Sequence, residues 1–407
     1  MEKFLDLKNP QEVYRDIIQA INPVVRIERV PLEESIGRVL AEDIFAPEDY
    51  PDFSRSTVDG FVVKAKDVFG ASHSDPAYLV KKGNINIGEE VSFVLQEGET
   101  YEIATGAMLP NGADAVVMRE YARDSGDSVE IIKGVATGEN ILKIGEDIKK
   151  GSNLLIKGIK ISAGIPGLLS AFGIYEVPVY LPLKVHIYSS GDEIILPSET
   201  KTKGKVRDVN TYNLFSLLKK ESLDYQYKGR LKDNLDIIAQ AFKNSLEEAD
   251  LVIISGGSSK SSKDYTENAI NSLGRPGVIV HGLLISPGKP SIVGKIGDKF
   301  VFGLPGHPTS CFVVSFLFLL PMIRRLSGLR DFLPKSFMVR LGESVFAKAS
   351  KETYILGKLT ENGLVLPLPT DSPLVFPISQ SDGLIKVPLG TEGKEKGDFV
   401  EFLPWRF

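Results

Sequence analysis

The stretch LVIISGGSSK, residues 251–260, places four apolar residues directly before a run of serines and glycines. A short apolar run that ends in such a loop is typical of a buried strand in a parallel sheet. The same arrangement occurs at residues 185–193 and again at Phe302, which the loop 303–308 follows. Between and after these runs, the sequence predicts helices at 212–221, 236–248, 264–273 and 309–326, a strand at 278–285 and a hairpin at 291–302. The alternation predicts a doubly wound α/β domain over residues 181–328.

The chain changes character on both sides of this domain. Residues 46–139 are rich in glycine and in short apolar runs, which predicts a β-rich domain. Residues 1–45 and 140–180 are expected to form a helical and linking domain, with helices after the capping box Asn9–Glu12 and at residues 32–44 and 162–172. Residues 332–407 show short strands and Pro/Gly turns, which predicts a C-terminal β-barrel. The expected fold class is therefore multidomain, α/β plus β.

Composition excludes several classes of protein. The net charge of −5 argues against a nucleic-acid binder. The single cysteine, Cys311, excludes an intrachain disulfide and a multi-thiolate metal site, and we expect it in the core. The first residues lack the pattern of a signal peptide, and the apolar run 311–320 is about half of what a membrane span needs. We therefore expect a cytoplasmic protein with no membrane or nucleic-acid partner.

Three loops follow predicted strands of the α/β domain: Ser189–Glu193, Ser255–Ser259 and Gly303–Pro308. In an open α/β sheet, ligands bind outside the carboxyl ends of the strands, so these loops are expected to meet at one crevice. Their glycines and serines let backbone amides approach an anion, which favours a phosphate-bearing ligand. Any one of the loops alone could be a plain turn, and for a lone Gly-Gly pair the plain turn is the favoured interpretation.

The ionisable residues near these loops are mostly carboxylates and lysines: Asp192, Glu193, Asp208, Lys263, Asp264 and Lys289. Oxygen ligands suit Mg²⁺ better than zinc. The four histidines, at positions 73, 186, 281 and 307, share no metal-ligand spacing, and His186 is expected in the core. Taken singly, Glu193 and Asp264 are better explained as ordinary solvated helix caps.

Seven motifs follow one another along nearly the whole chain: Phe53–Val62, Thr105–Asp114, Gly145–Ile148, Ser190–Ile194, Ser255–Ser259 with Asp264–Thr266, Pro287–Pro290 and Gly303–Pro308. In their order and residues they resemble the motifs of the MoeA family, whose eukaryotic counterpart is the gephyrin E domain. The resemblance implies a central molybdopterin-binding α/β domain, a β-rich domain and a C-terminal β-barrel. It also implies a homodimer with the active site between subunits, and other cofactor-biosynthesis proteins as partners.

The implied activity is that of a molybdopterin molybdenumtransferase, which inserts molybdate or tungstate into adenylylated molybdopterin and releases AMP with the help of Mg²⁺. By resemblance, the catalytic residues are Asp59, Thr105, Glu193 and Asp264, of which Glu193 and Asp264 hold the metal. The substrate contacts implied in the same way are Asp147, Ser190, Gly191, Asp192, Gly256, Gly257, Ser259, Lys289, Pro305, Gly306, Pro308 and Ser372.

Several positions depart from the family pattern. Among them, Leu142 and Ser286 replace basic residues, Ser261 replaces a glycine, and His307 replaces an asparagine. Two alternatives therefore stay open. One is a diverged, non-catalytic paralogue that binds molybdopterin or acts as a scaffold. The other is a molybdopterin adenylyltransferase, which is less favoured because those enzymes are short chains without the Asp59 and Thr105 regions.

Overall fold

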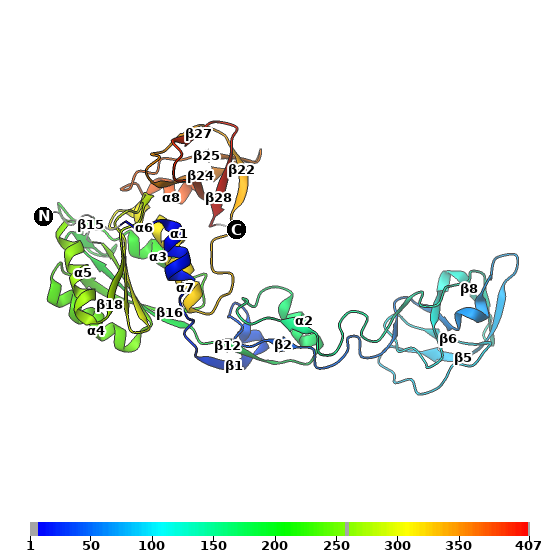
Figure 1. The fold of residues 1–407 in the computed structure, drawn as a ribbon. Helices are drawn as coiled ribbons and strands as arrows, with labels where there is room; N and C mark the ends of the chain where they lie inside the picture. The colour runs from blue at the N-terminus through cyan, green and yellow to red at the C-terminus, as the bar shows by residue number, and fades with distance from the viewer. Residues whose placement is uncertain (1–6, 257–259, 406–407) are drawn as a thin grey trace. The chain divides into compact units, whose positions relative to one another are not determined.

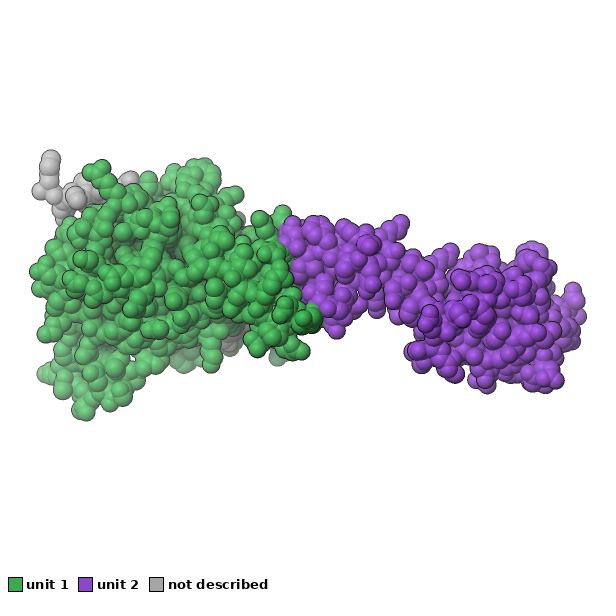
Figure 2. All heavy atoms as spheres, turned by 90° about the horizontal axis from the view of Figure 1, so that it is seen from below, with its two compact units in different colours: residues 1–42, 157–166, 175–407 green, residues 43–156, 167–174 purple. Residues whose placement is uncertain are grey.

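The computed structural model describes residues 7–256 and 260–405. The chain forms two compact units (Figure 2). Unit 1 comprises residues 1–42, 157–166 and 175–407, and unit 2 comprises residues 43–156 and 167–174. Each unit is described by itself below.

The centre of unit 1 is a six-stranded sheet in the order β16-β13-β17-β21-β20-β18 (Figure 1). The first four strands are parallel, and β20 and β18 are antiparallel to their neighbours. The strands are β13 (Leu183–Ser190), β16 (Leu223–Leu231), β17 (Leu251–Gly256), β18 (Pro276–His281), β20 (Ile292–Ile296) and β21 (Lys299–Leu304). The predicted α/β sheet and its hairpin are confirmed, whereas β16 was missed because its alternating polar residues hide the strand.

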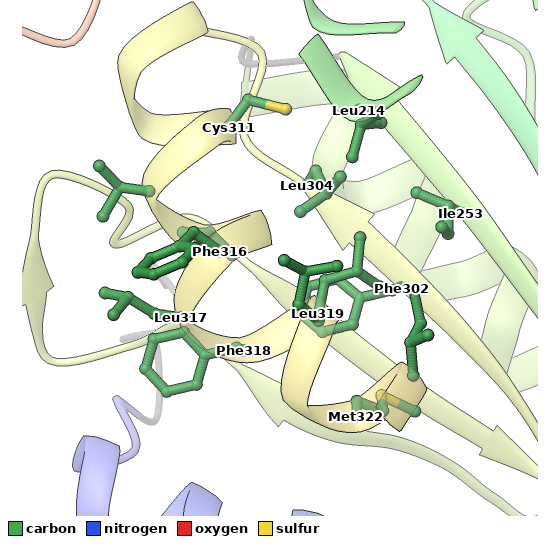
Figure 3. Close-up of a cluster of buried hydrophobic side chains, with 14 of the residues drawn as sticks. Leu214, Ile253, Phe302, Leu304, Cys311, Phe316, Leu317, Phe318, Leu319 and Met322 are labelled. Carbon is green, nitrogen blue, oxygen red and sulfur yellow. The ribbon is translucent and has the colours of Figure 1, made fainter. Parts of the chain in front are cut away.

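Helices cover both faces of this sheet. Successive side chains along a strand point to opposite faces, so the apolar strands need a cover on each side. On one face, α4 (Leu235–Glu248) and α5 (Lys260–Leu273) cover a cluster that includes Val252 and Ile254. On the other face, Ile253 and Phe302 pack against α3 (Asn210–Leu218) and the helix that begins at Pro308 (Figure 3). Cys311 is buried in this second cluster, as expected.

The long helix predicted from Thr309 consists of α6 (Pro308–Val314), a π-turn (Ser315–Leu319) and α7 (Leu320–Leu326). The π-turn ends two residues before Pro321, whose ring nitrogen has no N–H for regular helical hydrogen bonding. By length and composition alone this helix is able to cross a membrane, but 89% of its most apolar stretch is buried inside the protein. That burial is the property of a core helix.

The N-terminal helix begins as predicted, with Asn9 and Glu12 forming a reciprocal capping box around α1 (Pro10–Glu12). The helix continues through a π-turn (Val13–Ile18), in which Tyr14 stacks on Phe318 of the long helix. The predicted helix at residues 32–44 is wrong. Only Leu32–Ser35 forms a 3₁₀ turn, because Gly37 adopts a positive φ and the chain beyond it exchanges backbone hydrogen bonds with residues 158–161.

Outside the central sheet of unit 1, the short strands β1 (Ile27–Pro31) and β12 (Glu176–Tyr180) pair with each other. The C-terminal strands form a closed barrel, because β24 pairs with both β25 and β26. The barrel strands are β22 (Phe337–Leu341), β24 (Glu352–Leu359), β25 (Leu364–Pro367), β26 (Gly383–Val387) and β28 (Phe399–Pro404). The predicted barrel is confirmed. Its strand β24 also pairs with β19 (Ile285–Ser286), which follows the central sheet's edge strand.

Unit 2 contains a six-stranded sheet in the order β7-β4-β6-β5-β9-β8, which confirms the β-rich region. Its strands are β4 (Gly60–Val63), β5 (Ala77–Ile85), β6 (Glu99–Ile103), β7 (Ala115–Met118), β8 (Ala122–Asp124) and β9 (Ser128–Ile131). The helix α2 (Ile165–Ala171) falls within the predicted range 162–172.

Candidate active site

The three loops expected to share one crevice do begin at one edge of the central sheet. Ser190 at the end of β13 lies opposite Gly256 at the end of β17. Ser255 lies opposite Leu304 at the end of β21. Between β13 and β17 the chain order reverses, since β16 lies on the other side of β13. This is the topological switch point, where ligands of open α/β sheets bind.

Gly256 is required by the close approach of the first two loops. Its φ is +124°, and a Cβ at this position would lie less than 3.0 Å from the carbonyl oxygen of Ser190. No other residue combines this backbone conformation with this contact. The glycine therefore keeps the ends of β13 and β17 together. Gly257 and Ser259, predicted in the same loop, lie outside the described residues.

The side chain of Ser190 is held by a carboxylate that the sequence analysis missed. Its Oγ donates a hydrogen bond of 2.6 Å to Oδ1 of Asp233, and Ser190 is buried. Asp233 lies two residues beyond the end of β16, the strand that the sequence pattern did not indicate. A carboxylate at the end of a third parallel strand thus joins the same edge of the sheet.

The loop that carries Asp192 and Glu193 is fastened by two cations. Lys205 donates from Nζ to the carbonyl oxygen of Asp192 over 2.6 Å, and Arg230 donates to the carbonyl oxygen of Ile194. The carboxylate of Glu193 folds back over Gly191, whose missing Cβ leaves the space for it. Both carboxylates remain exposed at the surface of the loop.

The third loop contributes a backbone carbonyl, which Asn210 of α3 contacts. Asn210, at the start of α3, donates from Nδ2 to the carbonyl oxygen of Gly306 over 2.8 Å. Its Oδ1 is buried without a hydrogen-bond partner, and so is Oγ of Ser255 at the end of β17. Buried polar atoms without partners are costly, and they mark places where a ligand or water completes the hydrogen bonding. Asn210 was not predicted as a site residue.

Ser372 of the barrel is brought to the same loop. The hydroxyl of Ser310 donates to Oγ of Ser372 over 3.0 Å, and the amide of Thr309 donates to its carbonyl oxygen over 3.0 Å. Both partners lie in the first turn of α6, which begins at Pro308 directly after Gly306 and His307. The predicted residues Pro305, Gly306, Pro308 and Ser372 are therefore neighbours in the structure.

Lys289 belongs to a cluster of three lysines. Burial lowers the pKa of Lys351, and the positive charges of Lys348 and Lys289 lower this pKa further. Lys351 directly precedes β24, whose residue Thr353 pairs with Ser286 of β19. The barrel thus supplies cations beside the position where Ser286 replaces a basic residue, and lysines gathered in this way attract an anion. Lys348 and Lys351 were not predicted.

In unit 2, Asp59 and Thr105 are in direct contact. Thr105 donates two hydrogen bonds to Oδ1 of Asp59, one from its backbone amide over 2.7 Å and one from its hydroxyl over 3.0 Å. The backbone hydrogen bond, followed by the hydroxyl hydrogen bond, lowers the pKa of Asp59. The carboxylate is therefore ionised at neutral pH.

A pocket of about 170 Å³ opens beside Asp59. It is lined by Asp59, Gly60, Asn84, Ile85, Asn86, Glu102, Ile103, Ala104 and Arg119. Nη1 of Arg119 lies 3.1 Å from Oε1 of Glu102. The backbone amide of Arg119 donates a hydrogen bond to the carbonyl oxygen of Asp59. Asn84 and Glu102 come from β5 and β6, and Arg119 begins the 3₁₀ turn after β7. No motif in the sequence indicated them.

The remaining predicted residues are less well connected. Asp147 is exposed in unit 2, and within the described ranges no hydrogen bond or ion pair links it to Asp59 or Thr105. The side chain of Asp264 lies outside the described residues, although its backbone belongs to α5. Residues 7–256 and 260–405, so far as their side chains are described, contain no group of three metal-ligating side chains. His186 is buried, and burial lowers its pKa, as expected for a core histidine.

Comparison with known families accounts for almost the whole chain. The model described as "MoeA N-terminal region (domain I and II)" matches residues 9–173. The model described as "Probable molybdopterin binding domain" matches residues 186–325, and "MoeA C-terminal region (domain IV)" matches residues 338–405.

Individual proteins are similar over most of their length. A putative molybdopterin biosynthesis protein of Methanocaldococcus jannaschii is 34% identical over 98% of both chains. The molybdopterin molybdenumtransferase of Bacillus subtilis is 33% identical over 92% of this chain and 89% of its own. A solved structure of a molybdopterin biosynthesis MoeA protein from Pyrococcus horikoshii has a TM-score of 0.82 at 35% identity, covering 98% of this chain and 99% of that one.

Proposed function

The chain belongs to the MoeA family, and we propose that it is a molybdopterin molybdenumtransferase that inserts molybdenum into adenylylated molybdopterin and releases AMP. Relatives that carry the name molybdopterin molybdenumtransferase match 92% or more of the chain at 30–33% identity. The single observation in the fold that carries the proposal is the meeting of the ends of β13, β17 and β21, together with Ser372, at the switch point of the central sheet.

The reaction requires two kinds of recognition. The phosphoanhydride that joins AMP to molybdopterin must be held while it is cleaved, and molybdate must reach the dithiolene sulfurs. Backbone amides of the glycine and serine loops suit the phosphates. Lys289 and Lys351 suit the oxyanion, because two lysines near each other stabilise its negative charge. Asp59, which Thr105 keeps ionised, offers the substrate a negatively charged hydrogen-bond acceptor.

We assign Mg²⁺ to the same edge of the sheet. Glu193 and Asp264 are the ligands we propose. Mg²⁺ commonly takes only one or two carboxylates from the protein and completes its shell with water and substrate phosphates. The exposed carboxylate of Glu193 fits that donor set, since no cation of the described chain forms an ion pair with it. Bound there, the ion neutralises phosphate charge.

The family resemblance also supports a homodimer with the active site between subunits, which we adopt as part of the proposal. The alternative of a diverged, non-catalytic paralogue rests on lost basic residues, above all at Ser286. Lys351 weakens that argument because it places a cation next to the same position from the barrel side. The adenylyltransferase alternative does not account for the matched N- and C-terminal regions.

The test is cofactor synthesis with the purified chain, adenylylated molybdopterin, Mg²⁺ and either molybdate or tungstate. We expect AMP release coupled to metal insertion, read by reconstitution of an apo-molybdoenzyme. The comparison of the two oxyanions also gives the metal preference. Tight binding of the pterin substrate without AMP release contradicts the proposal and favours the non-catalytic paralogue.

A further inference from the structure

The pocket beside Asp59 in unit 2 has a donor and acceptor arrangement of its own. Oδ1 of Asp59 is occupied by Thr105, whereas Oδ2 accepts no hydrogen bond from any described residue. The side chain of Asn84 also has no hydrogen-bond partner within the described part of the chain. Arg119 uses Nη1 toward Glu102 and has further N–H groups in its exposed guanidinium. The pocket therefore offers a free acceptor, a free amide and a free donor.

The charges of this pocket disfavour an anion. Asp59 is ionised, and Glu102 adds a second carboxylate that Arg119 contacts from one side. Nζ of Lys81 lies 2.9 Å from Oε2 of Glu102, but it also lies 2.5 Å from Oδ2 of Asp124. Its positive charge is therefore divided between two carboxylates. The free oxygen of Asp59 thus faces the ligand as a negative charge. A phosphate or molybdate placed here would meet like charge, which is destabilising.

The size and walls of the pocket suit one planar ring. Its volume of about 170 Å³ is smaller than the roughly 300–1,000 Å³ of pockets that enclose drug-sized ligands. Ile85, Ile103 and Ala104 supply apolar wall, and the polar groups come from Asp59, Asn84 and Arg119. Such walls pack against the ring while the polar groups pair with its edge.

We propose that this pocket binds an uncharged aminopyrimidine ring of the substrate and excludes its phosphates and the oxyanion. The ring's amino group donates to Oδ2 of Asp59, and its ring nitrogen or carbonyl oxygen accepts from Arg119. Asn84 pairs with the remaining edge. The inference rests on the proposed function, because adenylylated molybdopterin contains two such rings, the pterin and the adenine. Both share this edge chemistry.

The experiment measures ring binding to the full chain without turnover. One arm titrates 6-hydroxymethylpterin by its fluorescence, and the other titrates adenosine by calorimetry, each in the presence and absence of inorganic phosphate or molybdate. Variants Asn84→Ala and Arg119→Ala remove pocket groups. Arg123→Ala is the matched control, because Arg123 is an exposed arginine of the same unit that does not line the pocket.

We expect one of the two rings to bind, and the stronger ligand identifies the source. Its affinity should fall about tenfold in Asn84→Ala and in Arg119→Ala, as for loss of one hydrogen bond to the bound ring, and stay unchanged in Arg123→Ala. Neither phosphate nor molybdate should displace it. Binding of neither ring, displacement by either anion, or unchanged affinity in both pocket variants overturns the inference. Cofactor synthesis is read separately, so this result does not depend on the transferase assay.

Discussion

Thr105 directs both its backbone amide and its hydroxyl at the same oxygen of Asp59, Oδ1, over 2.7 and 3.0 Å. The two residues lie 46 positions apart, and β4 and β6, which adjoin them, are paired in the sheet of unit 2. The arrangement leaves the second oxygen of Asp59 for a ligand. It also explains why the pKa of an exposed carboxyl is lowered.

Thr105→Val should raise the pKa of Asp59 toward its ordinary value, because the hydroxyl hydrogen bond to the ionised form is lost while the backbone bond remains. Thr105→Ser keeps the hydroxyl and should leave the pKa low. Carbon-13 NMR titration of the carboxyl measures both. Activity of Thr105→Val should then decline at a higher pH than the wild type as the solution is acidified. Equal titration curves for the two variants would show that the hydroxyl does not act on Asp59.

Ser190 and Asp233 should behave as an energetically coupled pair. Ser190→Ala and Asp233→Asn each disturb a hydrogen bond of 2.6 Å between a buried hydroxyl and a carboxylate. A double-mutant cycle followed by urea unfolding should give a coupling of about 1–2 kcal/mol. Substrate affinity should fall in both single variants, because Ser190 lies at the edge where the loops meet. Additive effects on stability would mean that the hydrogen bond contributes nothing.

Gly256→Ala should destabilise the central domain by about 3 kcal/mol, since it combines a strained φ with a clash against the backbone of Ser190. Gly297→Ala is the matched control: Gly297 also has a positive φ, in the turn between β20 and β21, but a Cβ there meets nothing within 4 Å. It should cost about 1 kcal/mol. Urea unfolding of both variants measures the loss of unfolding free energy and separates backbone strain from the steric clash. Equal losses in the two variants would show that the close contact with Ser190 does not destabilise Gly256→Ala.

The elements that the sequence predicts correctly are those in which the hydrophobic pattern and the local chemistry agree. The central sheet follows from uninterrupted apolar strands, and the capping box at Asn9 and Glu12 places the first helix. The failures have physical causes. β16 alternates exposed and half-buried residues at the edge of the sheet, so its sequence does not look like that of a buried parallel strand. The pattern of residues 32–44 predicts a helix, but backbone hydrogen bonds with residues 158–161 hold this segment in another conformation.

The same limits apply to the candidate site. The three loops were predicted from serines and glycines after strands, and their convergence follows from parallel topology. Asp233 was missed together with the strand that carries it. Asn210 and Lys351 were missed because their positions depend on folding between distant segments, which no local motif indicates. Asp59 and Thr105 were known only from resemblance, and the geometry adds their hydrogen bonds.

Lys351→Ala should weaken binding of molybdate at pH 7 by about tenfold, and Lys289→Ala should do the same, since each removes one cation of the cluster. Calorimetric titration with molybdate measures the loss, and Lys358→Ala on the exposed side of β24 is the control. In Lys289→Ala the pKa of Lys351 should rise, because one neighbouring positive charge is gone. Unchanged affinity in both variants would exclude this cluster as the oxyanion site.

His186 should make folding stability depend on pH. Burial, and then the charge of Lys228, lower its pKa below the value of about 6.5 that the unfolded chain has, while Glu248 opposes the shift and Asp224 and Lys184 contribute smaller effects. The unfolded chain therefore binds more protons between the two pKa values, and stability falls as the pH drops below about 6.5. His186→Leu removes this titration, so its unfolding midpoint should change less between pH 7 and pH 5 than that of the wild type. His73→Gln alters an exposed histidine and should preserve the wild-type slope. If His186→Leu keeps that slope as well, other groups cause the acid sensitivity.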